Sequence, residues 1–178
     1  MLRANEYRTH TCGELRESDI GKQVKVSGWL ENVRDHGGVK FADLRDQYGI
    51  VQVVVEDEAI LEGIPKESAI CVIGVVTERD EDTINKKLDT GYVEIEADTI
   101  TVLGKVRELL PFEVTSSKET KEELRLKYRF LDLRNAEVQK NIILRSQVIS
   151  FIRSKMTELG FLEIQTPILT SSSPEGAR

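Results

Sequence analysis

Five short runs of residues with the two-residue alternation of β-strands fill much of the first hundred positions of this 178-residue chain. In the first run, Val24, Val26 and Leu30 alternate with polar neighbours, which is the pattern of a half-buried strand. Polar, glycine-containing turns at 34–38 and 45–49 separate the first three runs. We expect strands over residues 23–31, 39–44, 50–55, 68–79 and 92–102.

A predicted helix lies between the third and fourth strands. Residues 56–63 read as a short helix that Pro65 ends, and a polar loop at 80–87 joins the last two strands. Five strands with a helix after the third is the order of an OB-fold barrel. Other small β-barrels would fit the number of strands, but they do not usually carry a helix at that point. We therefore expect an OB-fold domain over residues 1–104, in a chain that is mainly β with α.

Residues 105–134 connect this barrel to a region with a different pattern. They contain Pro111, and Thr115–Ser117 is a plausible N-terminal cap for a charged helical turn through Glu123. We expect this segment to be a hinge or linker between two domains.

The last region has a helical period. Apolar residues recur at helical spacing from Val138 to Leu159, and Gly160 is a natural C-terminal cap. Phe161–Gln165 reads as a brief strand. Because one helix and one strand cannot enclose a core, residues 135–178 look like the first part of an α+β domain.

The net charge differs between the two regions. Residues 1–110 carry 14 basic and 22 acidic residues, a net of −8, whereas residues 111–178 have a net of +2. Non-specific binding to duplex DNA depends on neutralising phosphates, so the acidic region argues against a DNA partner. If the first region binds a nucleic acid, a few placed groups on a small face must do so.

Neither a membrane span nor a metal site is expected. No apolar run approaches the ~20 residues that cross a bilayer, and the N-terminus shows no apolar leader segment. Cys12 and Cys71 are widely spaced, and only His10 and His36 could join them, which does not fit a zinc site. Reduced thiols are typical of a cytoplasmic protein, which is the location we expect.

An ordered series of short motifs runs along nearly the whole chain. They are Arg8–Gly13, Val26–Trp29, Arg34–Gly38, Asp43–Asp46, Gly49–Val53, Thr90–Glu94, Tyr128–Arg134 and Gly160–Pro167. The series resembles the N-terminal part of bacterial-type aspartyl-tRNA synthetases. The resemblance implies an anticodon-binding OB barrel, a hinge and the start of a class II catalytic domain built on an antiparallel sheet.

The resemblance also implies which residues read the anticodon of the tRNA. Single-stranded bases are recognised by stacking on aromatic side chains and by hydrogen bonds to their edges. By resemblance, Phe41 stacks on the middle uridine, Gln52 bonds to its edge, and Glu94 accepts hydrogen bonds from a guanine at the first position. The contacts to the backbone and the third base would come from Arg34, Arg79 and Asn85.

Other interpretations of these residues remain open from the sequence. Phe41 can be a core residue, and Glu94 an ordinary solvated residue of a strand. Gln52 is flanked by β-branched residues, and a buried amide needs hydrogen-bond partners. His36 stands where the family has His or Leu. By resemblance, His there accompanies enzymes that also charge the asparagine tRNA, but a solvated turn histidine fits the sequence equally well.

The sequence departs from the family pattern at several basic positions. Glu31, Asn32 and Val33 leave only Arg34 where relatives carry a run of arginines, and Thr77 and Glu78 stand where a basic residue is common. Fewer phosphate contacts predict weaker RNA binding with a shallower salt dependence.

The C-terminal segment resembles class II motif 1, which forms the homodimer interface in the family. Pro167 would lie at that interface, and Glu175 would lie in the mobile loop near the ammonium group of the aspartate substrate. The arginine motifs that hold ATP do not occur in this sequence, and no glycine-rich phosphate cradle replaces them. We therefore expect no catalytic residues, cofactor or metal in this chain, with ATP and Mg²⁺ used by the whole enzyme.

The expected function is the tRNA-binding part of an aspartate–tRNA ligase. Aspartate tRNA is the expected partner, with asparagine tRNA as a second candidate. One alternative is a stand-alone OB-fold protein that binds single-stranded RNA or a protein partner, which the depleted arginines favour and the motif 1 segment disfavours. A second alternative is an asparaginyl-tRNA or lysyl-tRNA synthetase. Glu94 and Pro174–Ala177 favour the aspartyl enzyme over this alternative.

Overall fold

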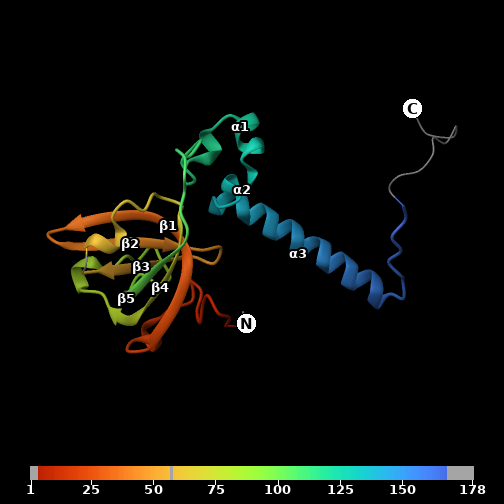
Figure 1. The fold of residues 1–178 in the computed structure, drawn as a ribbon. Helices are drawn as coiled ribbons and strands as arrows, with labels where there is room; N and C mark the ends of the chain where they lie inside the picture. The colour runs from red at the N-terminus through yellow and green to blue at the C-terminus, as the bar shows by residue number, and fades with distance from the viewer. Residues whose placement is uncertain (1–3, 57, 168–178) are drawn as a thin grey trace. The chain divides into compact units, whose positions relative to one another are not determined.

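The computed structural model describes residues 4–56 and 58–167. The chain divides into two compact units, Met1–Leu110 and Pro111–Arg178 (Figure 1). Within the described residues, no helix is both long and apolar enough to cross a membrane.

The first unit is a closed barrel of five strands (Figure 1). The strands are β1 (Gln23–His36), β2 (Val39–Arg45), β3 (Ile50–Val55), β4 (Ala69–Glu78) and β5 (Val93–Gly104). They follow one another around the barrel in the order β1-β2-β3-β5-β4. Every neighbouring pair is antiparallel except β3 and β5, which run parallel. This is the predicted OB-fold architecture.

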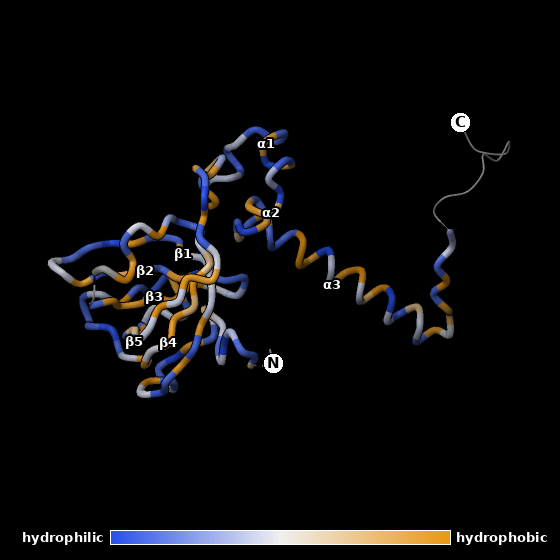
Figure 2. Tube along the Cα trace, in the orientation of Figure 1, coloured by the Kyte–Doolittle hydropathy of each residue, from blue (hydrophilic) through white to orange (hydrophobic). Residues whose placement is uncertain are grey.

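Alternation along the strands separates a buried interior from an outer face. On β2, Ala42 and Leu44 are fully buried, whereas Phe41 and Asp43 point to the opposite side of the sheet. The interior is built from aliphatic residues, and the tube in Figure 2 is orange where the residues of the strands are hydrophobic. The largest fully buried ones are Leu15, Leu30, Leu44, Ile70, Ile95, Val24, Val26, Val51, Val53, Val55, Val72 and Val76.

The hairpin between β1 and β2 is tighter than predicted. A turn was expected over 34–38, but β1 continues to His36 and only Gly37 and Gly38 form the turn. Their φ angles are 67° and 102°, so both glycines adopt the positive values that a two-residue hairpin turn requires. The prediction was wrong at this end of β1, and the correction places Arg34 on a strand, opposite Phe41.

Among its described residues, the segment between β3 and β4 contains one 3-10 turn. A helix was predicted over 56–63, and the structure has η2 (Glu58–Leu61). Gly63, with a φ of 65°, and Pro65 follow it, and neither residue favours continuing a helix. The two other short 3-10 turns described in this unit are η1 (Glu17–Asp19) and η3 (Glu81–Thr83).

The second unit is helical in its described part. It contains η4 (Ser117–Glu119), α1 (Glu122–Lys127), α2 (Arg129–Asp132) and α3 (Ala136–Glu158). The expected cap at Thr115–Ser117 is not formed by these side chains, because Ser116 precedes η4 without a capping side-chain hydrogen bond. The hydroxyl of Ser117 instead donates to Asp132 Oδ1 at 2.9 Å.

The long helix α3 starts at a cap that the sequence reasoning did not identify. The side-chain oxygen of Asn135 accepts from the backbone N–H groups of Glu137 and Val138. Its amide nitrogen donates to the carbonyls of Val114 and Thr115, which ties the start of α3 to the preceding segment.

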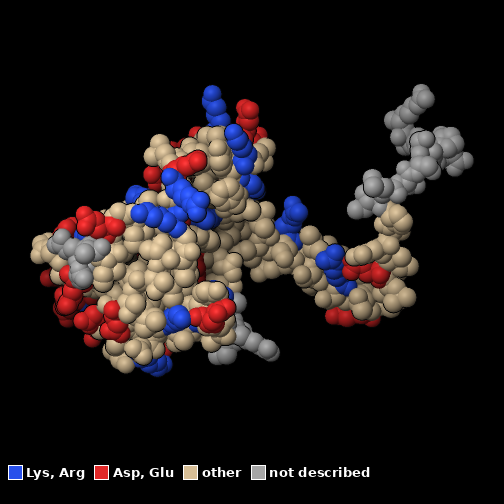
Figure 3. Space-filling view, in the orientation of Figure 1, with Lys and Arg blue, Asp and Glu red and all other residues tan. Residues whose placement is uncertain are grey.

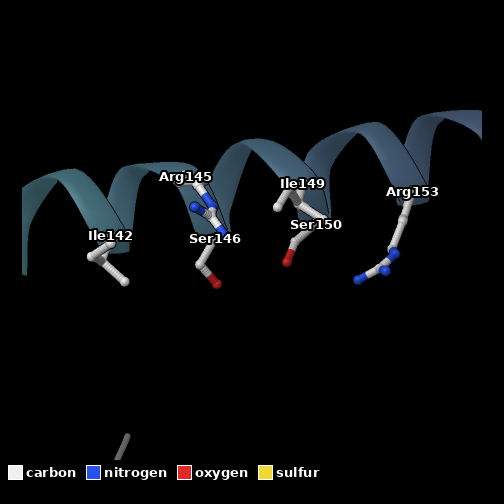
Figure 4. Close-up of a pocket in the computed structure, with 6 residues that line it drawn as sticks. All are labelled: Ile142, Arg145, Ser146, Ile149, Ser150 and Arg153. Atoms are coloured by element: carbon white, nitrogen blue, oxygen red, sulfur yellow. The ribbon is translucent and has the colours of Figure 1, made fainter. Parts of the chain in front are cut away.

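Most apolar residues of α3 are exposed. Val138 is buried, but Ile142, Ile149 and Met156 are at least 40% exposed, and Figure 2 shows hydrophobic residues along the length of the helix. Figure 4 shows one side of α3, where a pocket is lined by Ile142, Arg145, Ser146, Ile149, Ser150 and Arg153.

The segment after α3 differs from the prediction. Gly160 follows the helix with a φ of 89°, as expected for a residue after a C-terminal cap. Phe161–Gln165 was predicted as a brief strand, but it is irregular in the structure. A strand is stable only when a neighbour pairs with it, and no described segment of residues 111–167 is a strand that could do so.

Candidate nucleic-acid interface

Five charged or amide side chains meet on the outer face of the barrel. We call this set the polar cluster: Arg34 on β1, Asp43 on β2, Gln52 on β3, Glu94 on β5, and Arg79 directly after β4. The strand register brings them together, because Gln52 lies opposite Asp43 on one side and beside Glu94 on the other. The cluster therefore depends on the closed sheet and not on a single loop.

Gln52 is the centre of the polar cluster. Its side-chain oxygen accepts from Arg34 Nη2 at 3.1 Å, and its side-chain nitrogen donates to Glu94 Oε2 at 2.7 Å. The same Arg34 nitrogen also donates to Asp43 Oδ1 at 2.8 Å. Gln52 is only 7% exposed, and a buried amide needs hydrogen-bond partners. Two charged neighbours, Arg34 and Glu94, supply them.

Arg79 is the most buried member of the polar cluster and lies next to Glu94. It is 5% exposed, its Nε donates to the carbonyl of Val93 at 3.0 Å, and the same atom lies 4.0 Å from Glu94 Oε2. Its Nη2 is buried and has no hydrogen-bond partner among the described residues. A buried donor without a partner is costly, so this nitrogen is a candidate contact for a bound ligand.

Burial shapes the electrostatics of the polar cluster. Desolvation raises the pKa of Glu94, while its hydrogen bond from Gln52 and the charge of Arg79 partly oppose that rise. Desolvation likewise raises the pKa of Asp43, against the charges of Arg34 and Arg79. The same effect lowers the pKa of Arg79. These charges are therefore poorly hydrated, and added hydrogen-bond partners would be favourable.

Phe41 lies on the same outer face as the polar cluster. It is half-buried opposite Val54 and does not belong to the buried core. The ring of His36 meets it edge-on, with ring centroids 5.7 Å apart and an interplanar angle of 75°. His36 itself is exposed and lies at the end of β1 beside the glycine turn. An aromatic ring beside hydrogen-bonding groups is the arrangement that binds single-stranded bases.

Asn85 lies apart from the polar cluster in its hydrogen bonding. Among the described residues, no hydrogen bond joins it to a member of the cluster. It lies in the loop between β4 and β5, and its side-chain oxygen accepts from the backbone N–H of Lys87 at 3.1 Å. Its backbone bonds to Gly91 and Leu88 close the loop. Asn85 thus shapes this loop, and a contact to RNA stays a prediction.

Two of the predicted site residues lie at or beyond the end of the described chain. Pro167 is exposed and follows the irregular segment after α3. Glu175 lies outside the described residues. Within residues 4–56 and 58–167, no group of three or more His, Cys, Asp or Glu side chains could hold a metal ion.

Asp43 belongs to the site, although the sequence reasoning gave it no role. The pairing register of β2 and β3 would have identified Asp43, because a hairpin around the turn at 45–49 places Asp43 opposite Gln52. That register could not be set from the strand pattern alone.

A second charged cluster lies elsewhere on the barrel. Arg45 donates to Glu67, its Nε lies 3.4 Å from Glu31 Oε2, and its guanidinium carbon lies 5.5 Å from the centre of the Trp29 ring. Glu67 has a φ of 64°, which is rare for a residue other than glycine. Arg45 and Glu67 are both buried, so this cluster links β1 and β2 to the segment that precedes β4.

The surface of the barrel is rich in acidic groups. Figure 3 shows acidic side chains along the left edge of the barrel unit. The first 110 residues have a net charge of −8. If this unit binds a nucleic acid, binding must rely on specific contacts at one face rather than on a general positive potential.

Comparison with known families assigns both regions of the chain. The family described as OB-fold nucleic acid binding domain matches residues 24–103. The family described as tRNA synthetases class II (D, K and N) matches residues 121–178. Together they support the predicted succession of an OB-fold domain and the start of a class II synthetase domain.

The individual proteins that this chain resembles are also tRNA ligases and synthetases. The chain is 55% identical to the aspartate–tRNA(Asp/Asn) ligase of Pelagibacter ubique and 52% identical to the aspartate–tRNA ligase of Streptomyces coelicolor. Each match covers 98% of this chain but only 30% of the relative. The asparaginyl-tRNA synthetase of Pyrococcus horikoshii with asparaginyl-adenylate matches with a TM-score of 0.77 and 25% identity, over 94% of this chain and 38% of that one. By sequence, this chain carries matches to an OB-fold nucleic acid binding domain and to the class II (D, K and N) tRNA synthetases, and over nearly its whole length it is similar to bacterial aspartate–tRNA ligases, of whose length it spans about 30%.

Proposed function

We propose that this chain is the anticodon-binding part of an aspartate–tRNA ligase and that the outer face of the barrel binds the anticodon loop. One observation carries the proposal: Phe41 and the polar cluster share a single face of an OB fold. The ring offers a stacking surface, and the cluster offers donors and acceptors beside it.

Each side chain has a chemical role in this proposal. The ring of Phe41 stacks on the middle uridine, and the amide of Gln52 offers that base both a donor and an acceptor. The carboxylate of Glu94 accepts from the N1 and N2 groups of a guanine at the first position. The guanidinium groups of Arg34 and Arg79, with Asn85 in the loop, contact the backbone and the third base.

The choice between tRNAs is a further part of the proposal. His36 touches the ring of Phe41, so its side chain lies beside the proposed stacking surface. The two relatives described above differ in the specificity that their names give, tRNA(Asp/Asn) for the Pelagibacter ubique enzyme and no second tRNA for that of Streptomyces coelicolor. We assign aspartate tRNA as the partner and asparagine tRNA as a second one that His36 would permit.

The whole enzyme would use ATP and Mg²⁺ in the cytoplasm to activate aspartate and transfer it to tRNA. Within the described residues, no group of three or more His, Cys, Asp or Glu side chains could hold a metal ion. The exposed helix α3 and the segment to Pro167 would form a homodimer interface, and Glu175 would approach the aspartate.

Binding of a short anticodon stem-loop tests the proposal. Phe41→Ala should weaken binding at low salt by about 1–3 kcal/mol, because one base loses its stacking partner. Tyr48→Ala is the matched control, since Tyr48 is an exposed aromatic residue in the turn at the opposite end of β2. Equal effects of both variants, or no binding of the parent chain, would contradict the proposal. Unfolding of the Phe41 variant would show that this residue is structural.

A further inference from the structure

The amide group of Gln52 is held in one orientation by charges on both sides. Its oxygen faces the guanidinium of Arg34, and its nitrogen faces the carboxylate of Glu94. Turning the amide by half a rotation would place N–H groups against a cation and an oxygen against an anion. Because the site is largely shielded from water, both contacts would be strongly unfavourable.

A fixed amide can distinguish two pyrimidines. After its bonds to Arg34 and Glu94, the Gln52 side chain retains one N–H donor and one oxygen lone pair. Uracil presents an acceptor at O4 beside a donor at N3, whereas cytosine presents a donor at N4 beside an acceptor at N3. An amide that turns freely can pair with either base, but an amide held in one orientation matches only one of the two patterns.

Asp43 completes the restraint on this amide. Arg34 lies near the end of β1, and its side chain is 47% exposed, so it would be mobile without an anchor. The Arg34 nitrogen that bonds to Gln52 also donates to Asp43 at 2.8 Å. Asp43 lies opposite Gln52 in the β2–β3 register, so it draws the guanidinium over the amide oxygen.

We infer that Asp43 is a positioning residue for base selection: by anchoring Arg34 against Gln52 it locks the amide in the orientation that accepts uracil and rejects cytosine at the middle anticodon base. The inference rests on the proposed function, because it takes the base beside Gln52 to be that pyrimidine. Asp43 itself touches no base in this arrangement.

Two stem-loops that differ only in a U or a C at the middle anticodon position test this inference in the full chain. The parent should bind the U loop about tenfold more tightly than the C loop, which is the discrimination expected of a good two-bond contact. In Asp43→Ala, that preference should fall to below about threefold, because Arg34 no longer holds the amide. The side-chain amide resonance of Gln52 should also shift in this variant.

Glu96→Ala is the matched control. Glu96 is exposed and lies two residues from Glu94 along β5, so the change removes one negative charge from the same strand face. It should strengthen binding of both loops equally and leave the preference unchanged. Arg34→Met removes the same restraint through a side chain that is half exposed, and it replaces Asp43→Ala if that variant fails to fold.

The outcomes separate the two proposals. If the parent prefers U and both Asp43→Ala and Arg34→Met keep the full preference, the positioning role of Asp43 is wrong while the proposed function stands. If the parent binds both loops equally, the proposed function and the inference fail together. Loss of preference in the two variants, with the control unchanged, supports both.

Discussion

Glu94 and Asp43 are carboxylates placed where burial raises the pKa. Each is held in its charged form by a neighbouring cation or amide donor, so the two groups keep acceptor strength in a site with little water. Asp132 in the second unit behaves in the opposite way. Burial alone would raise its pKa, but hydrogen bonds from Arg125 and Ser117 outweigh that effect and lower it.

Anticodon binding should weaken on mild acidification. The pKa of Glu94 lies above its ordinary value of 4.5 because of burial, so the carboxylate takes up a proton as the pH falls through that raised pKa. A protonated carboxyl accepts less well from guanine, and affinity for a loop with guanine at the first position should drop in this range. Titration of the Kd from pH 7 down to pH 4 measures the effect. In Glu94→Gln the pH dependence should be smaller than in the parent, and what remains comes from Asp43, whose pKa burial also raises; a pH dependence equal to that of the parent would contradict the role of Glu94.

The second unit should lose stability at lower pH through Asp132. Its folded pKa is below the unfolded value, so the stabilising contribution is complete above the unfolded pKa and disappears as the pH falls through the folded one. Thermal unfolding followed between pH 6 and 3 should show this loss. Asp132→Asn should lower stability at pH 6 and remove much of the acid dependence; a variant as stable as the parent at pH 6 would refute the assignment.

The strands of the barrel can be predicted from short-range sequence patterns, but the contacts between the strands cannot. The ends of β2, β3, β4 and β5 lie within one or two residues of the predicted ranges, because alternation and turn residues mark them. The end of β1 was missed because either a two-residue or a five-residue turn fits the same polar segment. Phe161–Gln165 was predicted as a strand from its local sequence alone, but strand formation depends on a partner.

A close approach between β4 and β5 should make Gly74 essential to the barrel. A Cβ atom on Gly74 would lie 2.1 Å from the carbonyl oxygen of Glu96, at an irregularity in the pairing of these strands. Gly74→Ala should therefore destabilise the barrel by about 1–3 kcal/mol. In Gly104→Ala the new Cβ would lie 3.9 Å from Ala69, so urea unfolding should show little change. Similar midpoints for the two variants would argue against the close approach.

At the scale of the whole chain, the proposed reading face, formed by Phe41 and the polar cluster, lies on an acidic barrel, and a helix with exposed apolar residues follows it in the sequence. The outward direction of Phe41, Gln52 and Glu94 was predictable from strand alternation. The hydrogen bonds from Arg34 and the role of Asp43 were not, because they depend on the register between strands that the sequence leaves open.

The exposed residues of α3 should promote self-association of this chain. Ile149 and Ile152 are 40% and 53% exposed on the helix, and burying such groups between copies is favourable. Sedimentation at rising concentration should show dimers or larger species. Ile149→Glu should shift the chain toward monomer, whereas Ser150→Glu, with the same added charge one position along, should shift it less. A parent chain that stays monomeric at high concentration would count against this prediction.

The most direct test of the proposed reading face is a titration of the ¹⁵N-labelled chain with the aspartate anticodon stem-loop at low salt, followed by NMR. The proposed function predicts that the largest shifts fall on the outer face around Phe41, Gln52 and Glu94, together with the side chains of Arg34 and Arg79. Shifts centred on the Arg45 and Glu67 cluster or on α3, with the outer face unchanged, would contradict it.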